Sequence, residues 1–173
     1  MQLRTKEANM AEYPTELYSQ IAPNLFMGGT DDDATIDQPQ ILQDLTATNE
    51  FDCVVTLYAW AAPAGWGVEE RRFGFPDSHI IDEYIPTIVE LAQWAHAKWS
   101  AGKRVNIRCQ AGLNRSGLVT ALTLMFSGKS AADAIELIRT NRSEFALCNS
   151  YFERWLLSQG NVAIEQAHFK KSA

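Results

Sequence analysis

The sequence predicts a single α/β domain, with a central and mainly parallel β-sheet flanked by helices. Segments rich in β-branched residues alternate with segments whose apolar residues have helical spacing, and this alternation is typical of a parallel sheet. The chain has 173 residues, of which 46% are hydrophobic, and these values suit one folded domain with a substantial core. Neither an internal repeat nor a low-complexity run divides it.

Four strands are predicted. Residues 25–27 form a short apolar run closed by Gly28 and Gly29, and residues 53–57 are rich in β-branched side chains. The other two are residues 70–75 and residues 105–108. An acidic stretch, Asp31 to Asp33, follows the first strand and is interpreted as a solvated turn.

The helices are predicted from apolar residues three or four positions apart, and they dominate the second half of the chain. They are residues 39–49, 82–99, 115–126, 130–140 and 150–160. Ser130 and Ser150 each precede an acidic residue by three positions, which indicates a capping box at two of these helix starts. Residues 1–16 are predicted to be an N-terminal arm, residues 17–160 the folded domain and residues 161–173 a polar tail.

Composition excludes several classes of partner. The formal net charge of −6 offers no general attraction to nucleic acid or to an acidic membrane surface. No apolar stretch is long enough to cross a bilayer, and residues 1–20 lack the apolar core of a secretory signal. We therefore expect a cytoplasmic protein with neither a nucleic-acid nor a membrane partner. The sequence does not indicate an oligomeric state.

The cysteines and histidines form no pattern of a disulfide scaffold or a metal site. The three cysteines, Cys53, Cys109 and Cys148, are scattered, and the three histidines are far apart in sequence. No metal ion or cofactor is expected. Cys53 is interpreted as a core residue, and Cys148 is a candidate for reversible pairing with Cys109 under oxidation.

The informative segment runs from Val105 to Gly117. A strand leads into Cys109, and after five further residues Arg115 begins a helix. A short loop at such a junction can point its N–H groups inward, and the helix start adds partial positive charge, so a phosphate is the natural occupant. Gly112 allows the loop to curl, and Arg115 offers a planar fork to two oxygens. The candidate phosphate-binding residues are Gln110, Ala111, Gly112, Leu113, Asn114 and Arg115.

The same loop suits a nucleophile. A helix start and a nearby cation favour the thiolate form of a cysteine, so Cys109 is the candidate nucleophile. Ser116 is placed to donate its hydroxyl to the sulfur and to stabilise it as a leaving group. Asp77, in the turn-forming Pro-Asp-Ser sequence ahead of a predicted helix, is the candidate acid for the leaving oxygen. Its rival is Asp82, which is also interpreted as an N-terminal helix residue.

The chain resembles the dual-specificity phosphatases of the protein-tyrosine-phosphatase superfamily, from about Ile21 to Leu157. The resemblance is strongest in Cys-Gln-Ala-Gly-Leu-Asn-Arg-Ser-Gly, residues 109–117, and extends to residues 24–28 and to the last two helices. It implies nucleophile Cys109, phosphate-binding Arg115, general acid Asp77 and accessory Ser116. It also implies phosphorylated protein or a small phosphate ester as the substrate.

This chain departs from the family pattern at two positions. Arg108 stands before the nucleophile where the family usually has a histidine, and Asn106 is polar on a strand that the family keeps apolar. Both side chains need hydrogen-bond partners if they are buried.

Other residues near the motif keep two interpretations each. They are Asn149, as a brace of the loop or a helix cap; Trp60 and Trp66, as a wall beside the phosphoryl group or as packing; and Arg139 and Arg142, as substrate contacts or solvated helix-end residues. Cys109 itself has the alternative of a buried structural cysteine.

Several functions share this motif. A phosphoinositide or other non-protein phosphate ester is an alternative substrate, although the loop from Cys109 to Arg115 contains no lysine to attract a polyphosphorylated headgroup. A non-catalytic phosphate-binding module is a second alternative. Rhodanese-like sulfur transfer and arsenate reduction also use a cysteine loop, but neither needs an acid placed like Asp77.

Overall fold

A computed structural model describes residues 14, 16–30, 50–65 and 67–172, with the side chains described up to residue 170. It contains a five-stranded sheet in the order β1-β2-β5-β3-β4. The strands are β1 (Tyr18–Ala22), β2 (Leu25–Gly28), β3 (Cys53–Thr56), β4 (Glu69–Arg72) and β5 (Val105–Arg108). The helices are the short η2 (Asp82–Tyr84), α2 (Ile85–Ser100), α3 (Arg115–Phe126), α4 (Ala131–Asn141) and α5 (Ser150–Ser172).

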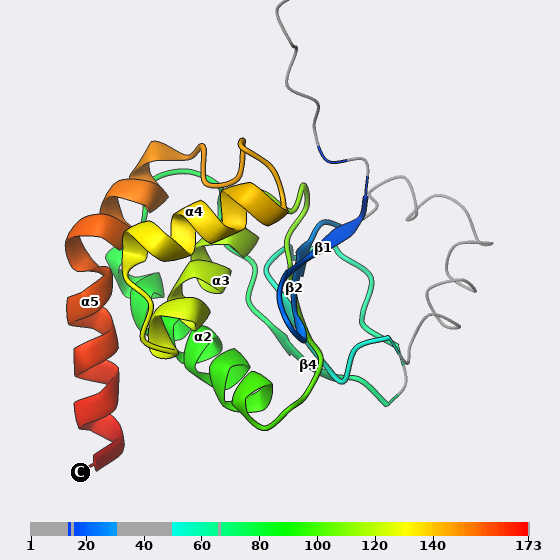
Figure 1. Cartoon of the computed structure of the whole chain (residues 1–173), viewed down its shortest axis with the longest axis horizontal. Helices are drawn as coiled ribbons and strands as arrows, with labels where there is room; N and C mark the ends of the chain where they lie inside the picture. The colour runs from blue at the N-terminus through cyan, green and yellow to red at the C-terminus, as the bar shows by residue number, and fades with distance from the viewer. Residues whose placement is uncertain (1–13, 15, 31–49, 66, 173) are drawn as a thin grey trace, which may run out of the picture.

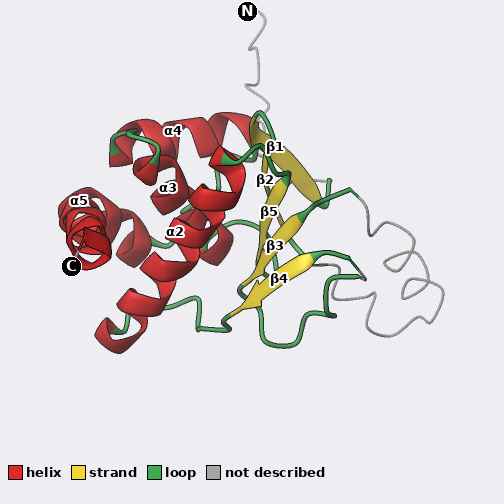
Figure 2. Ribbon diagram, turned by 90° about the horizontal axis from the view of Figure 1, so that it is seen from below, coloured by secondary structure: helices red, strands yellow, loops and turns green. Residues whose placement is uncertain are grey.

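The sheet is parallel except at one edge. β5 is central and pairs in parallel with β2 and β3, β3 pairs in parallel with β4, and only β1 is antiparallel, against β2. Helices α2 to α5 lie on one side of the sheet (Figure 2). Because β2, β3 and β5 are parallel, their carboxyl ends meet at one edge of the sheet, and the residues that follow them lie close together there. The predicted fold class is confirmed.

Helix α3 is the centre of the helical layer (Figure 1). Every residue from Ser116 to Phe126 is buried, which explains why this segment is apolar around its whole circumference. It contacts α2, α4 and α5 as well as β2 and β5. The first turn of α3 therefore starts from a fully packed position, directly after the loop that follows β5.

Two elements differ from the sequence prediction. β1 was not predicted because it is short and lies at an edge; the turn at Pro23 and Asn24, with Asn24 at φ 63°, joins it to β2. The last helix was predicted to end near Gly160, but α5 continues to Ser172. Its buried face continues through Gly160, which packs on Met125, and Ile164, which belongs to the core. The predicted helix 39–49 and the Asp31–Asp33 turn lie outside the described residues.

The remaining predicted elements agree with the structure within a few residues. Ser130 caps α4, since its Oγ accepts a hydrogen bond of 3.1 Å from the Asp133 amide. Pro86 lies in the first turn of α2, where its missing N–H costs no intrahelical bond. Among the described residues, none of the helices is both long and apolar enough to cross a membrane.

Candidate active site

The Cys109 loop, which we define as residues 109–115, joins β5 to the amino end of α3. Cys109 is 2% exposed, and its Sγ lies 3.2 Å from Oγ of Ser116, a buried residue in the first turn of α3. A hydroxyl at that distance is able to donate a hydrogen bond to a thiolate, and the helix start adds partial positive charge. The structure thus brings Cys109 and Ser116 together as the sequence predicts.

Hydrogen-bond donors in this loop lack acceptors. Within the described part of the chain, the backbone N–H groups of residues 111–115 donate to no other group. Nε of Arg115 is buried and also has no partner there. A buried donor without an acceptor, such as Arg115 Nε, is uncommon in folded proteins. Together with the unpaired amides of the same loop, it forms an environment suited to a bound oxyanion.

The guanidinium of Arg115 is oriented by its other nitrogens. Nη1 donates to the carbonyl of Phe75 at 3.2 Å, and Nη2 donates to Oε1 of Gln110 at 3.4 Å. The carbon Cζ lies 5.4 Å from the ring centroid of Tyr58, which follows β3. Nε is the nitrogen of the group that has no acceptor among the described residues. The segments after β3 and β4 therefore help to position the arginine.

Glycines at the end of β2 allow the Cys109 loop to lie against this strand. Gly112 has φ +68°, and a Cβ there would lie 2.4 Å from the carbonyl carbon of Gly28 and from the nitrogen of Gly29. The Cys109 amide donates to the Gly28 carbonyl at 3.2 Å. Gly28 and Gly29, which the sequence indicated only as the end of a strand, thus form the surface on which the loop rests.

Arg142 is buried and binds the backbone of the Cys109 loop, which corrects the prediction that it meets substrate or solvent. The residue is 8% exposed, and its Nε donates to the Gly112 carbonyl at 3.1 Å. Nη1 donates to the Glu16 carbonyl and to Oγ of Ser19, and Nη2 donates to the Leu17 carbonyl. Burial lowers the pKa of Arg142, an effect opposed by the negative potential of Cys109 and Glu16. The guanidinium joins the Cys109 loop to β1.

The carboxylate of Asp77 lies beside the end of the Cys109 loop. Oδ2 accepts from Nδ2 of Asn114 at 3.0 Å, and Oδ1 accepts from Nδ2 of Asn149 at 2.7 Å. The candidate acid is thus in contact with the residue that precedes Arg115. Asp82 has no such contact and begins η2, as its helix-start interpretation predicts.

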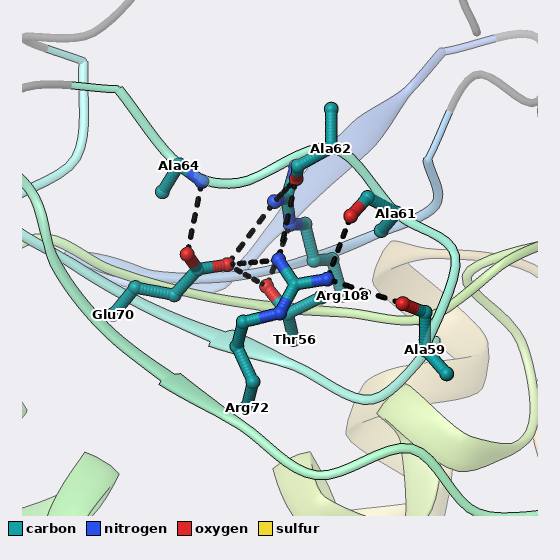
Figure 3. Close-up of polar contacts among 8 residues, drawn as sticks. All are labelled: Thr56, Ala59, Ala61, Ala62, Ala64, Glu70, Arg72 and Arg108. Carbon is teal, nitrogen blue, oxygen red and sulfur yellow. Dashed lines mark hydrogen bonds and ion pairs between the residues drawn. The ribbon is translucent and has the colours of Figure 1, made fainter.

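A charged network accounts for Arg108 (Figure 3). The residue faces Thr56 in the register of β5 on β3, and its Nε donates to Oγ1 of Thr56 at 2.9 Å. Its Nη2 donates to the Ala62 carbonyl at 2.6 Å and lies 3.3 Å from Oε1 of Glu70. Arg72 binds the same Glu70 oxygen at 2.9 Å. The strand that carries Cys109 is therefore tied to β3 and β4 by one carboxylate shared between two guanidinium groups.

The same network holds the loop after β3. Arg72 Nη2 donates to the Ala61 carbonyl at 2.6 Å, and Oε2 of Glu70 accepts from the Ala64 amide at 3.0 Å. Together with the bond from Arg108 to Ala62, this fixes residues 61–64 against the sheet. Asn106, the other departure from the family pattern, is buried, and its Oδ1 has no partner among the described residues. Nothing in the structure explains that side chain.

Glu70 gives this network a pH dependence. Burial by itself raises the pKa of Glu70, but the hydrogen bonds from Thr56 and Ala64 and the charges of Arg72 and Arg108 outweigh burial and lower it below 4.5. A carboxylate with a lowered folded pKa contributes stability that is complete above the unfolded value and is lost as pH falls through the folded value.

Replacing Glu70 by glutamine should therefore lower stability most at neutral pH. We expect the free energy of unfolding to fall by about 1–3 kcal/mol at pH 7, since two half-buried guanidinium groups lose their carboxylate. Below pH 4.5 the difference from the wild type should shrink. Urea unfolding followed by circular dichroism from pH 3 to pH 7 measures this. The control is Glu136→Gln, at an exposed position on α4, and an equal loss for both variants would contradict the prediction.

The comparisons with known proteins rest on structure. No protein-family model matches the sequence, and no curated protein matches it. The chain is similar to the crystal structure of a mouse putative dual specificity phosphatase complexed with zinc tungstate, with 24% identity over 96% of this chain and 97% of that one and a TM-score of 0.68. It is similar to human DUSP28, with 21% identity over 91% and 99% and a TM-score of 0.66. The protein has the dual-specificity phosphatase fold.

Another solved structure extends this comparison. PTPMT1, determined in complex with PI(5)P, is 18% identical over 88% of this chain and 99% of that one, with a TM-score of 0.66. At these identities the likeness establishes the fold, and it agrees with the fold that the resemblance implied. It does not assign a role to any residue.

Two further predictions, for Cys53 and Trp60, have an outcome in the structure. Cys53 is buried in β3, as predicted, and burial raises the pKa of its thiol. Cys148 is an exposed free thiol 3.4 Å from Oδ1 of Asn114, and its pairing with Cys109 under oxidation stays a prediction. Trp60 is 80% exposed, so it does not pack against its loop, which was one of its two interpretations. Trp66 lies outside the described residues.

Arg139 has partners within the fold and is therefore not simply solvated. It pairs with Glu153 at 2.9 Å and donates to the carbonyls of Ala146 and Leu147. Ser150 therefore has no capping box, because Glu153 faces Arg139 and the cap of α5 is Asn149, whose Oδ1 accepts from the Tyr151 amide at 3.0 Å. Asn149 fits both of the interpretations that the sequence left open, since its backbone amide also donates to Oδ1 of Asn114 in the Cys109 loop at 3.0 Å.

Sequence reasoning missed the side-chain roles of Asn114, Tyr58 and Arg142. Asn114 was expected to bind phosphate and not to contact Asp77, Arg142 was expected to meet substrate or solvent, and no motif marks Tyr58. Their partners are 30 or more positions away in the chain, so only the folded structure reveals them. No group of three or more potential metal-binding side chains is present among the residues that the structure describes.

Proposed function

We propose that the protein is a cysteine phosphatase, which hydrolyses phosphate monoesters through a phosphocysteine intermediate on Cys109. The observation that carries this proposal is the buried sulfur of Cys109 within 3.2 Å of Ser116, in a loop where the amides of residues 111–115 and Arg115 Nε have no acceptor among the described residues. These donors are suited to the non-bridging oxygens of a phosphoryl group. The dual-specificity phosphatase fold supports the same chemistry.

The reaction would proceed in two steps. The Cys109 thiolate attacks phosphorus, the bond to the ester oxygen breaks, and that oxygen takes both bonding electrons and a proton from Asp77. Water then attacks the phosphocysteine and gives a proton to Asp77, while the sulfur leaves as a thiolate stabilised by the Ser116 hydroxyl. The products are an alcohol or phenol and inorganic phosphate. Arg115 and the loop amides balance the charge that develops on the phosphoryl oxygens in both steps.

The substrate class that we propose is phosphorylated protein, acted on by a tyrosine or dual-specificity phosphatase. The mouse and human neighbours are dual-specificity phosphatases by name, and the Cys109 loop lacks the lysine that a polyphosphorylated headgroup would favour. The complex of PTPMT1 with PI(5)P keeps a phosphoinositide as the alternative substrate. Parallel assays with a phosphotyrosine peptide, a phosphoserine peptide and PI(5)P vesicles separate these substrates. The cytoplasmic location remains a prediction.

Turnover of p-nitrophenyl phosphate with a chelator present tests the proposed chemistry. We expect activity that survives the chelator and is inhibited by orthovanadate, because a tetrahedral oxyanion would compete for the loop. A wild type that binds inorganic phosphate without turnover would instead be a phosphate-binding module. Activity that depends on added magnesium would overturn the cysteine mechanism.

Asp77→Asn should lower kcat for p-nitrophenyl phosphate by roughly 10²–10⁴-fold, the usual contribution of general acid catalysis. Asparagine keeps the size of the side chain and removes the proton that the leaving oxygen needs. Asp82→Asn is the control, because Asp82 is the rival acid and begins η2. An unchanged rate in Asp77→Asn, or the larger loss in Asp82→Asn, would show that the acid is not Asp77.

A further inference from the structure

Both oxygens of the candidate acid are held by asparagine side chains. Nδ2 of Asn149 lies 2.7 Å from Oδ1 of Asp77, and Nδ2 of Asn114 lies 3.0 Å from Oδ2. Asn149 Nδ2 also donates to the Ser78 carbonyl at 2.9 Å. We propose that Asn114 and Asn149, the asparagine pair, are positioning residues that hold the Asp77 carboxyl group in place for proton transfer. This inference rests on the proposed function.

Asp77 needs such support because of where it lies. The residue is exposed, in a segment without regular secondary structure between β4 and η2. An exposed aspartate side chain samples several rotamers, and proton transfer requires the carboxyl group within hydrogen-bond reach of the leaving oxygen. Two donors on two different oxygens restrict both the rotation and the tilt of the group. A misplacement of about 1 Å can cost about 10²-fold in rate.

The asparagine pair is itself fixed, and by different elements. Asn149 caps α5: its Oδ1 accepts from the Tyr151 amide at 3.0 Å and from the Phe152 amide at 3.4 Å. Phe152 is 1% exposed and lies 6.1 Å from the ring of Phe75, two residues before Asp77. The amino end of α5 and the segment that carries Asp77 are thus packed against each other.

Asn114 links this arrangement to the Cys109 loop. Its Oδ1 accepts from the Asn149 amide at 3.0 Å, so the two asparagines contact each other as well as Asp77. Its neighbour Leu113 accepts from the Leu147 amide at 3.1 Å. The next residue along the chain is Arg115, the candidate phosphate ligand. The acid and the phosphate-binding group therefore share one rigid support.

Substitutions at Asn149 can separate the positioning role from the capping role. Aspartate and serine cap helices about as well as asparagine, because both supply the accepting oxygen. Neither supplies the amide donor that Asp77 receives. Asn149→Asp adds a like charge beside Asp77, whereas Asn149→Ser adds none, so an effect common to both variants is the loss of the donor.

Leaving-group dependence is the measurement that a purely structural role would not change. Phenyl phosphate needs protonation of its leaving oxygen, whereas the delocalised 2,4-dinitrophenolate leaves without it. For Asn149→Ser and Asn149→Asp we expect kcat to fall about 10–100-fold with phenyl phosphate and by less than about 3-fold with 2,4-dinitrophenyl phosphate. The control is Ser130→Ala, which removes the cap of α4 and should not change kcat with either substrate.

A double variant completes the test. In an Asp77→Asn background, Asn149→Ser should have little further effect on phenyl phosphate turnover, because residues that act as a unit are not additive. Equal losses with both substrates, or full additivity in the double variant, would overturn the positioning role and leave the proposed function intact. A wild type without Cys109-dependent turnover of either substrate would overturn both.

Discussion

Cys109→Ser is expected to abolish phosphatase activity, with a loss of about 10⁴–10⁶-fold in kcat, the range seen when a hydrolase loses a member of its nucleophilic unit. A serine hydroxyl is not ionised near neutral pH, so the donors around the Cys109 loop have no thiolate to stabilise. An alkoxide is also a poorer leaving group than a thiolate in the second step. The measurement is the initial rate with p-nitrophenyl phosphate, together with a rapid acid quench to detect phosphate on Cys109 in the wild type.

The other two cysteines provide matched controls for this prediction. Cys148→Ser changes an exposed thiol, and we expect at least half of the wild-type activity to remain. Cys53→Ser changes a buried thiol in β3 and should lower stability more than activity. The thermal midpoint of Cys109→Ser should stay near that of the wild type, because the hydroxyl can still contact Ser116. Substantial activity in Cys109→Ser would disprove the covalent mechanism.

Gly112→Ala is expected to cause the second large loss, by displacing the Cys109 loop. A Cβ at this position would lie 2.4 Å from backbone atoms of Gly28 and Gly29, which cannot move without distorting β2. The backbone at φ +68° adds a strain of roughly 1–2 kcal/mol for any residue with a side chain. We expect a fall of about 10²-fold or more in turnover, since the loop positions both the nucleophile and Arg115.

Gly102→Ala is the control that separates the steric clash from the backbone strain. Gly102 has φ +80°, and a Cβ there would meet nothing within 4 Å, so it carries the strain without the clash. Its thermal midpoint should fall, while p-nitrophenyl phosphate turnover should stay within about 2-fold of the wild type, because the residue lies outside the loop that binds the phosphoryl group. Equal turnover in the two variants would show that the packing of Gly112 on β2 is not needed for activity.

The local part of the candidate site could be predicted because its residues are adjacent in sequence. Cys109, Arg115 and Ser116 lie within one strand–loop–helix unit, so backbone geometry alone brings Sγ and Oγ to 3.2 Å. Asp77 was placed by resemblance and turn chemistry, 32 residues before Cys109. The structure brings it to the Cys109 loop through Asn114, although its role as the acid remains a proposal.

The carboxyl end of α5 was predicted wrongly because the sequence there is polar. Residues after Gly160 are mostly polar, and the helix was predicted to stop there. The buried positions nevertheless continue at four-residue intervals, at Leu156, Gly160 and Ile164, and the ring of His168 lies 5.6 Å from that of Phe126 on α3. The packing partner of a helix, more than its own composition, decides where it ends.

Arg108 shows the same limit at a single position. The sequence reveals a cation before the nucleophile, in place of a histidine, but not where its side chain points. Strand alternation places its side chain on the same face of the sheet as that of Thr56, its register partner on β3. There it contacts Glu70 and the loop after β3. Arg108 holds that loop together with Glu70, which lies on β4, so its contacts could not be predicted from the sequence around Cys109.

By itself, the sequence determined the α/β class, the strand–loop–helix unit of residues 105–126 and the buried cysteine at its centre, because these depend on periodicity and on neighbours within a few residues. Tertiary structure alone decided what supports that unit: Gly28 beneath Gly112, Arg142 behind it, and the asparagine pair on Asp77. These contacts join residues that are far apart in the chain, and their hydrogen bonds and packing exist only after the elements have assembled. Local periodicity in the sequence therefore cannot predict these contacts.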